Sequence, residues 1–213
     1  MLKMLQKNGQ RVACRKLFED ILKDENIAMF QPKKDACDLY CSYKTGNITE
    51  QEYLQHVSRK ELARQEKSFD KIAAKNGTIH ITTADLQAVK ICPYLKVSAL
   101  YFKTKLMVHN FTIYNLGTNK VKCYWFDETT TDLKASTYAS LSVDYLNKLI
   151  YESPKDVVIF TDGCTSQNRN AIVSNALLQL AMQKKVVITQ KFLEKGHTQM
   201  EVDSVHSVIE RKL

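Results

Sequence analysis

The stretch Asp156-Val157-Val158-Ile159-Phe160-Thr161-Asp162 decides the fold of this 213-residue chain. Its five central residues are apolar or β-branched, and an apolar run this short is typical of a strand buried on both faces of a parallel sheet. Parallel strands need crossover connections, which are usually helices. The stretch therefore predicts a buried parallel strand that ends at a carboxylate and lies between two helices along the chain.

The flanking segments agree with this prediction. Apolar residues recur at helical spacing through residues 135–151, before the strand. After it, we expect a helix over residues 168–183, a strand over 186–191 and a final helix over 199–212. The C-terminal part of the chain therefore alternates between helices and strands.

Three further strands are expected upstream. Residues 78–86 are rich in β-branched side chains, residues 100–114 alternate apolar and polar groups, and residues 120–126 follow a turn. Three strands that can form an antiparallel meander, followed by alternating helices and strands, have the order of an RNase H-like fold. We predict an α/β domain of this type, with a mixed five-stranded sheet, over residues 77–213.

Residues 1–76 differ in composition from the rest of the chain, because they are rich in charged residues that favour helices. A long helix over residues 48–75 is predicted, since Thr49 and Glu52 have the spacing of a capping box and Asn76-Gly77 is a stop signal. We therefore expect an N-terminal helical region, residues 1–76, before the sheet domain.

Composition limits the class of protein and of partner. The net charge of +8 favours an acidic partner such as DNA. No apolar run reaches the roughly 18 residues of a membrane span, and the N-terminus lacks the apolar segment of a secretory signal, so we expect a nuclear or otherwise intracellular protein with no membrane partner. Six irregularly spaced cysteines are then more consistent with thiols or metal ligands than with disulfides.

Two aspartates have positions that suggest metal chemistry. Asp85 lies within or just after the first strand of the RNase H-like order, and Asp162 directly follows the fourth. Those two strands are neighbours in such a sheet, so the carboxylates would lie close together and repel unless a cation separates them. Oxygen ligands suit Mg²⁺ or Mn²⁺, and a pair of such ions supports phosphoryl transfer. We predict that Asp85 and Asp162 are metal-binding catalytic residues.

A third acid is expected from the last helix. Asp203 is the preferred candidate, because it lies near the helix start with His206 and Glu210 on the same face. Glu201 and Glu210 are the alternative candidates. If none of the three acids binds a metal, they simply form a solvated face of the helix. His206 is expected to be a structural partner of that face.

Residues after Asp162 could contact nucleic acid. Gln167, Asn168 and Asn170 lie at a predicted helix N-terminus, where amides and backbone donors hold phosphate, and Arg169 could contact a DNA backbone. The alternative is that Asn168 simply caps the helix.

Two other groups of residues complete the predictions. His197, in the loop before the last helix, could transfer a proton during catalysis, and a hydrogen-bonded histidine without chemistry is the alternative. Cys37, Cys41 and His56 could bind Zn²⁺, although buried free thiols would give the same pattern. The aromatic run Tyr124-Trp125-Phe126 is expected in the core.

Several of these stretches resemble a group of transposon-derived animal proteins with an RNase H-like, DDE/D transposase or integrase-type core. The resemblance covers roughly residues 30–213 and rests on residues 32–37, 85–87, 110–114, 162–170 and 191–198, continuing to Asp203, His206, Ile209 and Glu210. In that group two residues separate the paired cysteines. Here Tyr40 occupies the position of the second cysteine, and Cys41 follows it.

The resemblance implies a metal-dependent nuclease or strand transferase that acts on DNA phosphodiester bonds. Two alternatives remain open: a domesticated, inactive module that binds nucleic acid or protein, and a zinc-stabilised interaction module in which the acids are incidental. A homo-oligomer is possible in each case. Because the sequence ends inside the charged stretch Glu210-Arg211-Lys212-Leu213 and shows no sequence-specific DNA-binding motif, we expect it to be a piece of a longer protein.

Overall fold

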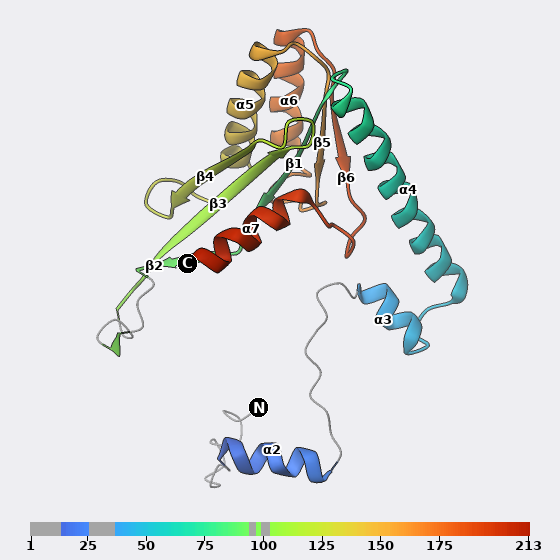
Figure 1. Ribbon diagram of the computed structural model, residues 1–213, viewed down its shortest axis with the longest axis vertical. Helices are drawn as coiled ribbons and strands as arrows, with labels where there is room; N and C mark the ends of the chain where they lie inside the picture. Colours follow the sequence, from blue (N-terminus) through green and yellow to red (C-terminus); the bar gives the residue numbers. More distant parts are fainter. Residues whose placement is uncertain (1–13, 26–36, 94–96, 99–102) are drawn as a thin grey trace. The chain divides into compact units, whose positions relative to one another are not determined.

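The computed structural model describes residues 14–25, 37–93, 97–98 and 103–213 (Figure 1). The chain divides into two compact units, residues 1–36 and residues 37–213. In the first unit the described element is helix α2 (Arg15–Asp24). Residues 32–36, which contribute to the family resemblance, and residues 100–102 of the expected second strand lie outside the described residues.

The second unit contains a mixed sheet that confirms the RNase H-like prediction. Neighbouring strands follow the order β4-β3-β1-β5-β6, in which β4, β3 and β1 are antiparallel and β1, β5 and β6 are parallel. This is the expected meander followed by two crossovers. The strands are β1 (His80–Leu86), β3 (Leu106–Asn115), β4 (Val121–Asp127), β5 (Val157–Thr161) and β6 (Ile188–Phe192).

Two details of the sheet differ from the prediction. A short sixth strand, β2 (Lys90–Cys92), extends the sheet beside β3 where β1 has ended. Strand β3 begins at Leu106 rather than at residue 100, and residues 103–105 are not part of it. Alternation alone could not place this boundary, because β4 pairs with β3 only from Val108 onward and the first residues of β3 face solvent in part.

Helices cover both faces of the sheet. Helices α5 (Ala135–Glu152) and α6 (Ala171–Lys184) lie side by side on one face and pack against Val157 and Ile159 of β5. The alternate residues of the same strand, Val158 and Phe160, join the core beneath α7 (Glu201–Lys212) on the other face. The continuous apolar run of β5 is thus explained by burial on two sides.

The helices before the sheet belong to the same compact unit. Helix α3 (Asp38–Lys44) is followed by α4 (Glu50–Lys75), which begins with the predicted capping box of Thr49 and Glu52. The chain leaves α4 through Asn76 and Gly77, and Gly77 has the left-handed φ of +74° that favours glycine. No helix among the described residues is both long enough and apolar enough to cross a membrane.

Ion pairs join α4 to the segments that follow β5. Lys191 of β6 lies 3.2 Å from Glu66 and 2.6 Å from Asp70, and Glu201 of α7 lies 2.8 Å from Lys67. Each pair is only partly buried and contributes little alone. Together they fix the position of α4 along β6 and the start of α7.

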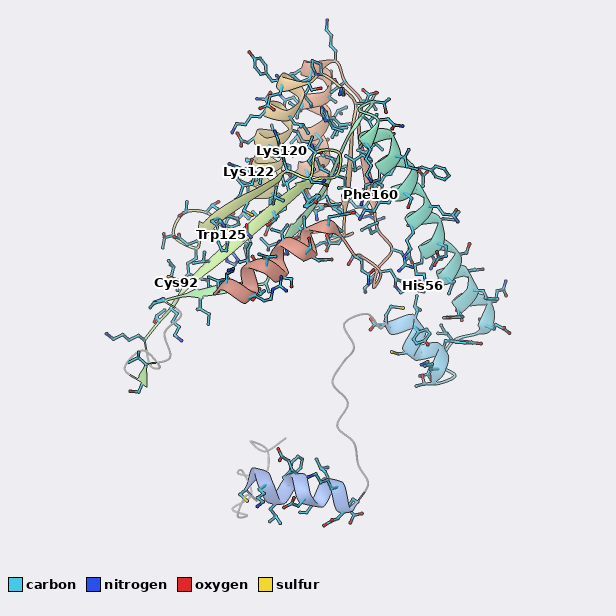
Figure 2. The ribbon with its side chains drawn as sticks, in the orientation of Figure 1. His56, Cys92, Lys120, Lys122, Trp125 and Phe160 are labelled. Carbon is cyan, nitrogen blue, oxygen red and sulfur yellow. The ribbon has the colours of Figure 1, made fainter. Side chains whose placement is uncertain are left out.

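The expected core position of Tyr124-Trp125-Phe126 is correct in part. Phe126 is buried, but the side chain of Trp125 on β4 is 48% exposed (Figure 2). Strand β4 is an edge strand whose successive side chains point to opposite faces, so an unbroken aromatic run cannot be wholly buried there.

Phe111 is the residue on which the core between β3 and α5 depends. Its side chain is fully buried, and its ring contacts that of Tyr138 edge-on with the centroids 5.5 Å apart. We expect Phe111→Ala to lower the free energy of unfolding by about 3–5 kcal/mol, because it leaves a cavity. The half-exposed Trp125 is the control, and Trp125→Ala should cost about 1 kcal/mol. Urea denaturation followed by circular dichroism measures both, and equal losses would contradict this account of the core.

Candidate active site

Strand pairing brings Asp85 and Asp162 to one end of the sheet. Thr83 of β1 is opposite Phe160 of β5, and continuing this parallel register by two residues places Asp85 opposite Asp162. Residues opposite one another in a parallel pair point to the same face. Because Phe160 packs beneath α7, both carboxylates lie on the face that α7 covers.

The surroundings of Asp85 confirm that the acids are close. The pKa of Asp85 is raised from 3.8 to about 7, chiefly by burial and then by the nearby charges of Asp162 and Asp203. A backbone hydrogen bond from Leu86 acts in the opposite direction. Like charges that are forced together in a partly buried place favour the protonated acid or a bound cation.

The structure distinguishes the three candidates for the third acid. Asp203, in the first turn of α7, lies with Asp85 and His206 in a group whose ligand atoms are all within 4.8 Å of one another. Glu201 instead pairs with Lys67 and Lys71 of α4. Asp203 is therefore the acid of α7 that faces Asp85.

Glu210, the remaining candidate, is held by other partners. It accepts a hydrogen bond of 2.9 Å from Gln87 and forms an ion pair with Lys90. Asp203 also has a second contact, since its Oδ2 accepts a 2.9 Å hydrogen bond from the backbone N–H of Met200. This bond holds the carboxylate at the helix start through Oδ2 and does not involve Oδ1.

His206 lies on the face of α7 that carries Asp203. We expected a structural partner of this face, and its ring forms one group with Asp85 and Asp203. Its Nε2 atom is buried and has no hydrogen-bond partner. Burial lowers the pKa of His206, so the neutral ring offers a lone pair.

Asp162 is oriented by the loop that follows it. Its Oδ1 accepts hydrogen bonds from the side-chain amide of Asn168, at 2.9 Å, and from the backbone N–H of Cys164, at 3.4 Å. Asn168 does not cap a helix: α6 begins at Ala171, and Asn170 is its N-cap, accepting a 3.0 Å bond from Val173. A run with two asparagines gave no means of choosing the cap from sequence.

The other two predicted nucleic-acid contacts lie in the same loop. Arg169 is exposed, and its guanidinium lies 5.6 Å from the ring centroid of Phe192. Gln167 is half-buried, and its Oε1 atom has no hydrogen-bond partner. Of the four residues, Arg169 is the one with a charge available to a ligand.

Considering each sequence position by itself did not predict Gln87 and Asn110 as residues of the site. Both are buried, and the side-chain amide of Asn110 donates a 2.9 Å hydrogen bond to Gln87. Gln87 in turn donates to Glu210 and to the backbone carbonyl of His206. This network attaches α7 to β1 and β3. The one signal in the sequence was the family resemblance, which includes both residues.

His197 lies in a second cluster with the predicted zinc ligands. Its Nε2 atom is 3.1 Å from Nε2 of His56, which is also 3.2 Å from Sγ of Cys37. Figure 2 shows His56 on α4. Cys41 is exposed on α3 and is not in this group. The sequence therefore indicated two of the three members, and assigned the third to the carboxylate site.

The carboxylate site has the donors that a divalent cation needs. Carboxylate oxygens of Asp85 and Asp203 and a ring nitrogen of His206 form one group, and Asp162 lies near Asp85. Carboxylate oxygens are the ligands that Mg²⁺ and Mn²⁺ prefer. The residues present thus fit the ions that an RNase H-like site implies.

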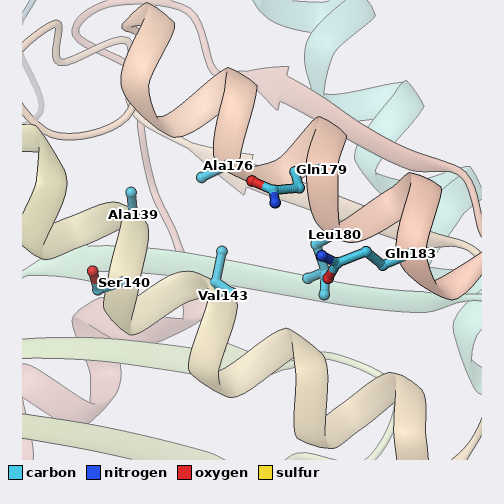
Figure 3. A pocket seen from close by; sticks show the side chains of 7 residues that line it. All are labelled: Ala139, Ser140, Val143, Ala176, Gln179, Leu180 and Gln183. Carbon is cyan, nitrogen blue, oxygen red and sulfur yellow. The ribbon is translucent and has the colours of Figure 1, made fainter.

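A groove of about 320 Å³ between α5 and α6 has no comparable chemistry. Its lining includes Ala139, Val143, Ala176 and Leu180 with the amides of Gln179 and Gln183, as Figure 3 shows. No titratable side chain lines it. The groove therefore offers neither an acid–base group nor a charged ligand for a metal.

Comparison with known proteins gives structural matches only. No protein-family model and no curated protein match the sequence. The Mos1 transposase paired-end complex with left transposon end is similar at 11% identity and a TM-score of 0.47, over 97% of this chain and 63% of that one. The Mos1 mariner paired end complex with Mn is similar at 13% identity and a TM-score of 0.42, over 97% of this chain and 78% of that one.

A retroviral assembly is also similar. The simian T-cell lymphotropic virus intasome in complex with PP2A regulatory subunit B56 gamma matches at 15% identity and a TM-score of 0.31, over 62% of this chain and 36% of that one. The chain thus spans less than two thirds of the Mos1 chain in the paired-end complex with left transposon end, and about a third of the intasome chain. The strand order, rather than these similarities, assigns the RNase H-like fold.

The raised pKa of Asp85 predicts a pH-dependent cost in stability. Unfolding returns the pKa from about 7 to 3.8, so the charged acid destabilises the metal-free fold increasingly between these values and fully above pH 7. Asp85→Asn should match the wild type near pH 4 and exceed its stability at pH 8 by at most about 4 kcal/mol. Urea denaturation in the presence of a chelator measures this difference. A difference that stays constant from pH 4 to pH 8 would show that the fold does not raise the pKa of Asp85.

Proposed function

We propose that this chain is the core of a metal-dependent nuclease or strand transferase that acts on DNA phosphodiester bonds. The observation that carries the proposal is the convergence of Asp85, Asp162 and Asp203 at one rim of an RNase H-like sheet. Stability alone does not account for three acids there, since their mutual repulsion disfavours the folded chain. Holding cations for phosphoryl transfer does account for it.

In this proposal each acid has a defined support. Asn168 and the backbone of Cys164 orient Asp162, the backbone of Met200 orients Asp203, and β1 itself holds Asp85. Divalent ions, when bound, activate a water or a 3′-hydroxyl group as nucleophile and stabilise the leaving oxygen. Asp85 retains its proton to near pH 7 without an ion, so binding an ion releases that proton.

DNA is the substrate that charge and surroundings favour. The chain carries a net charge of +8, which attracts a polyanion. Exposed Arg169 lies in the loop that also orients Asp162, so it is placed to contact a phosphate close to the cleaved bond. A role in holding the DNA backbone follows for this loop.

The proposal predicts metal binding and cleavage that depend on the acids. Wild-type chain should bind Mn²⁺ in calorimetric titration and should cleave duplex DNA in its presence. Asp162→Asn and Asp203→Asn should each lower the cleavage rate by at least about 100-fold, because each removes a charged ligand. Circular dichroism would establish that the variants are folded.

Glu152→Gln is the matched control. Glu152 is an exposed acid at the end of α5, and the chain from there enters β5 at the end opposite Asp162, so its loss should leave binding and cleavage unchanged. Mn²⁺ binding without cleavage would instead favour a domesticated protein that retained the ion site. Absence of any Mn²⁺ binding that depends on Asp162 would reject the proposal.

A further inference from the structure

The second cluster lies where the helices before the sheet meet the loop before α7. Cys37 precedes α3, His56 lies in the second turn of α4, and His197 lies in the loop after β6. Their ligand atoms are all within 4.8 Å of one another. Sequence separations of 19 and 141 residues show that only the fold brings the three together.

The orientation of His56 leaves a lone pair in the middle of this cluster. Its Nδ1 atom is 3.2 Å from Oε1 of Glu194, and a carboxylate only accepts hydrogen bonds, so Nδ1 carries the proton. In the neutral ring Nε2 is then unprotonated, and it faces both the Cys37 sulfur and the His197 Nε2 atom. A carboxylate that orients a ligating histidine through its other nitrogen is typical of metal sites.

Hydrogen bonding alone accounts poorly for this arrangement. A single lone pair of His56 would have to accept from both neighbours, at 3.2 Å and 3.1 Å. A tetrahedral zinc ion holds its sulfur and nitrogen ligands roughly 3.3–3.6 Å apart. The observed separations are close to these values, so a small outward movement of the ligand atoms would accommodate the ion.

A catalytic thiol would require a different environment. Cys37, His56 and Glu194 have the order of a nucleophile, a base and an orienting acid, but Cys37 is only 6% exposed and His56 only 2% exposed. A nucleophile that a substrate cannot reach is inert. A structural zinc site, in contrast, has buried ligands, and here Cys37 and His56 are buried while His197 is half-buried.

The backbone is also shaped to bring the loop onto Cys37. Gly196 has a φ of +80°, and a Cβ atom at this position would lie 2.4 Å from Cβ of Cys37. Glycine is therefore the residue that permits the approach. Its neighbour His197 reaches the cluster because the loop passes this close.

We propose that Cys37, His56 and His197 bind one structural Zn²⁺ ion, with Glu194 as the residue that orients His56. The ion joins the α3–α4 segment to the loop that leads into α7. Because α7 carries Asp203 and His206, zinc fixes the start of the helix that completes the carboxylate site. This site uses one sulfur and two nitrogens and is separate from the oxygen-rich site, so it does not depend on the proposed nuclease activity.

Elemental analysis of the purified full chain tests the site. We expect about one zinc per chain in the wild type and in Cys92→Ser, which alters an exposed cysteine outside the cluster. Cys37→Ser, His56→Ala and His197→Ala should each lose most of the zinc. A wild-type chain that contains less than about a tenth of an equivalent after expression with added zinc would overturn the proposal. Equal loss in Cys92→Ser and Cys37→Ser would also overturn it.

Two further measurements remain informative if a variant fails to fold. Cobalt substituted into the wild-type chain should show a sulfur-to-cobalt charge-transfer band, and its absence would exclude the Cys37 thiolate as a ligand. Glu194→Gln should retain the ion but bind zinc about 10–100-fold more weakly, as expected for an orienting residue. Unchanged zinc affinity in Glu194→Gln would contradict the role assigned to Glu194.

Discussion

The parallel pairing of β1 with β5 is the constraint on which the rest of the site depends. Its register places Asp85 opposite Asp162, and side chains in a strand alternate between faces, so a shift of one residue would move one acid to the other side of the sheet. Packing prevents that shift. Val157 and Ile159 are held by α5 and α6, while Val158 and Phe160 are held beneath α7. The free energy of burying both faces therefore holds two repelling carboxylates together.

The third acid reaches the same rim by tertiary contacts rather than by strand pairing. Helix α7 is attached to β1 and β3 through Gln87 and Asn110, and Glu201 attaches its first turn to α4. Gln87 and Asn110 are buried, and Oδ1 of Asn110 has no hydrogen-bond partner, so these contacts position α7 more than they stabilise the fold. They fix which face of α7 is turned toward Asp85.

The described residues contain two clusters of different chemistry, one that includes His197 in the loop between β6 and α7 and one that includes Asp203 of α7. The cluster of Asp85, Asp203 and His206 is rich in oxygen, as hard divalent cations prefer, whereas Cys37, His56 and His197 offer sulfur and nitrogen. This difference would allow each cluster to select its own ion from the same solution. Helix α4 also contributes to the position of the last helix, because Lys67 and Lys71 pair with Glu201.

Local patterns in the sequence determined the elements of this protein. The apolar run of β5 predicted a buried parallel strand, Thr49 and Glu52 predicted the start of α4, and the order of the elements predicted the sheet. The same order also placed Asp85 beside Asp162, because neighbouring strands follow from topology. These features depend on residues that are close in the chain or on the sequence of elements, so they can be inferred without coordinates.

Only the tertiary structure decided how side chains from distant elements are combined. Asp203 was one of three acids with similar local surroundings until the partners of Glu201 and Glu210 were known. His197 was assigned to the carboxylates because it precedes α7, yet its ring faces His56 on α4. Helical periodicity indicates that a face exists but does not say which neighbour it meets, because that depends on packing between segments more than a hundred residues apart.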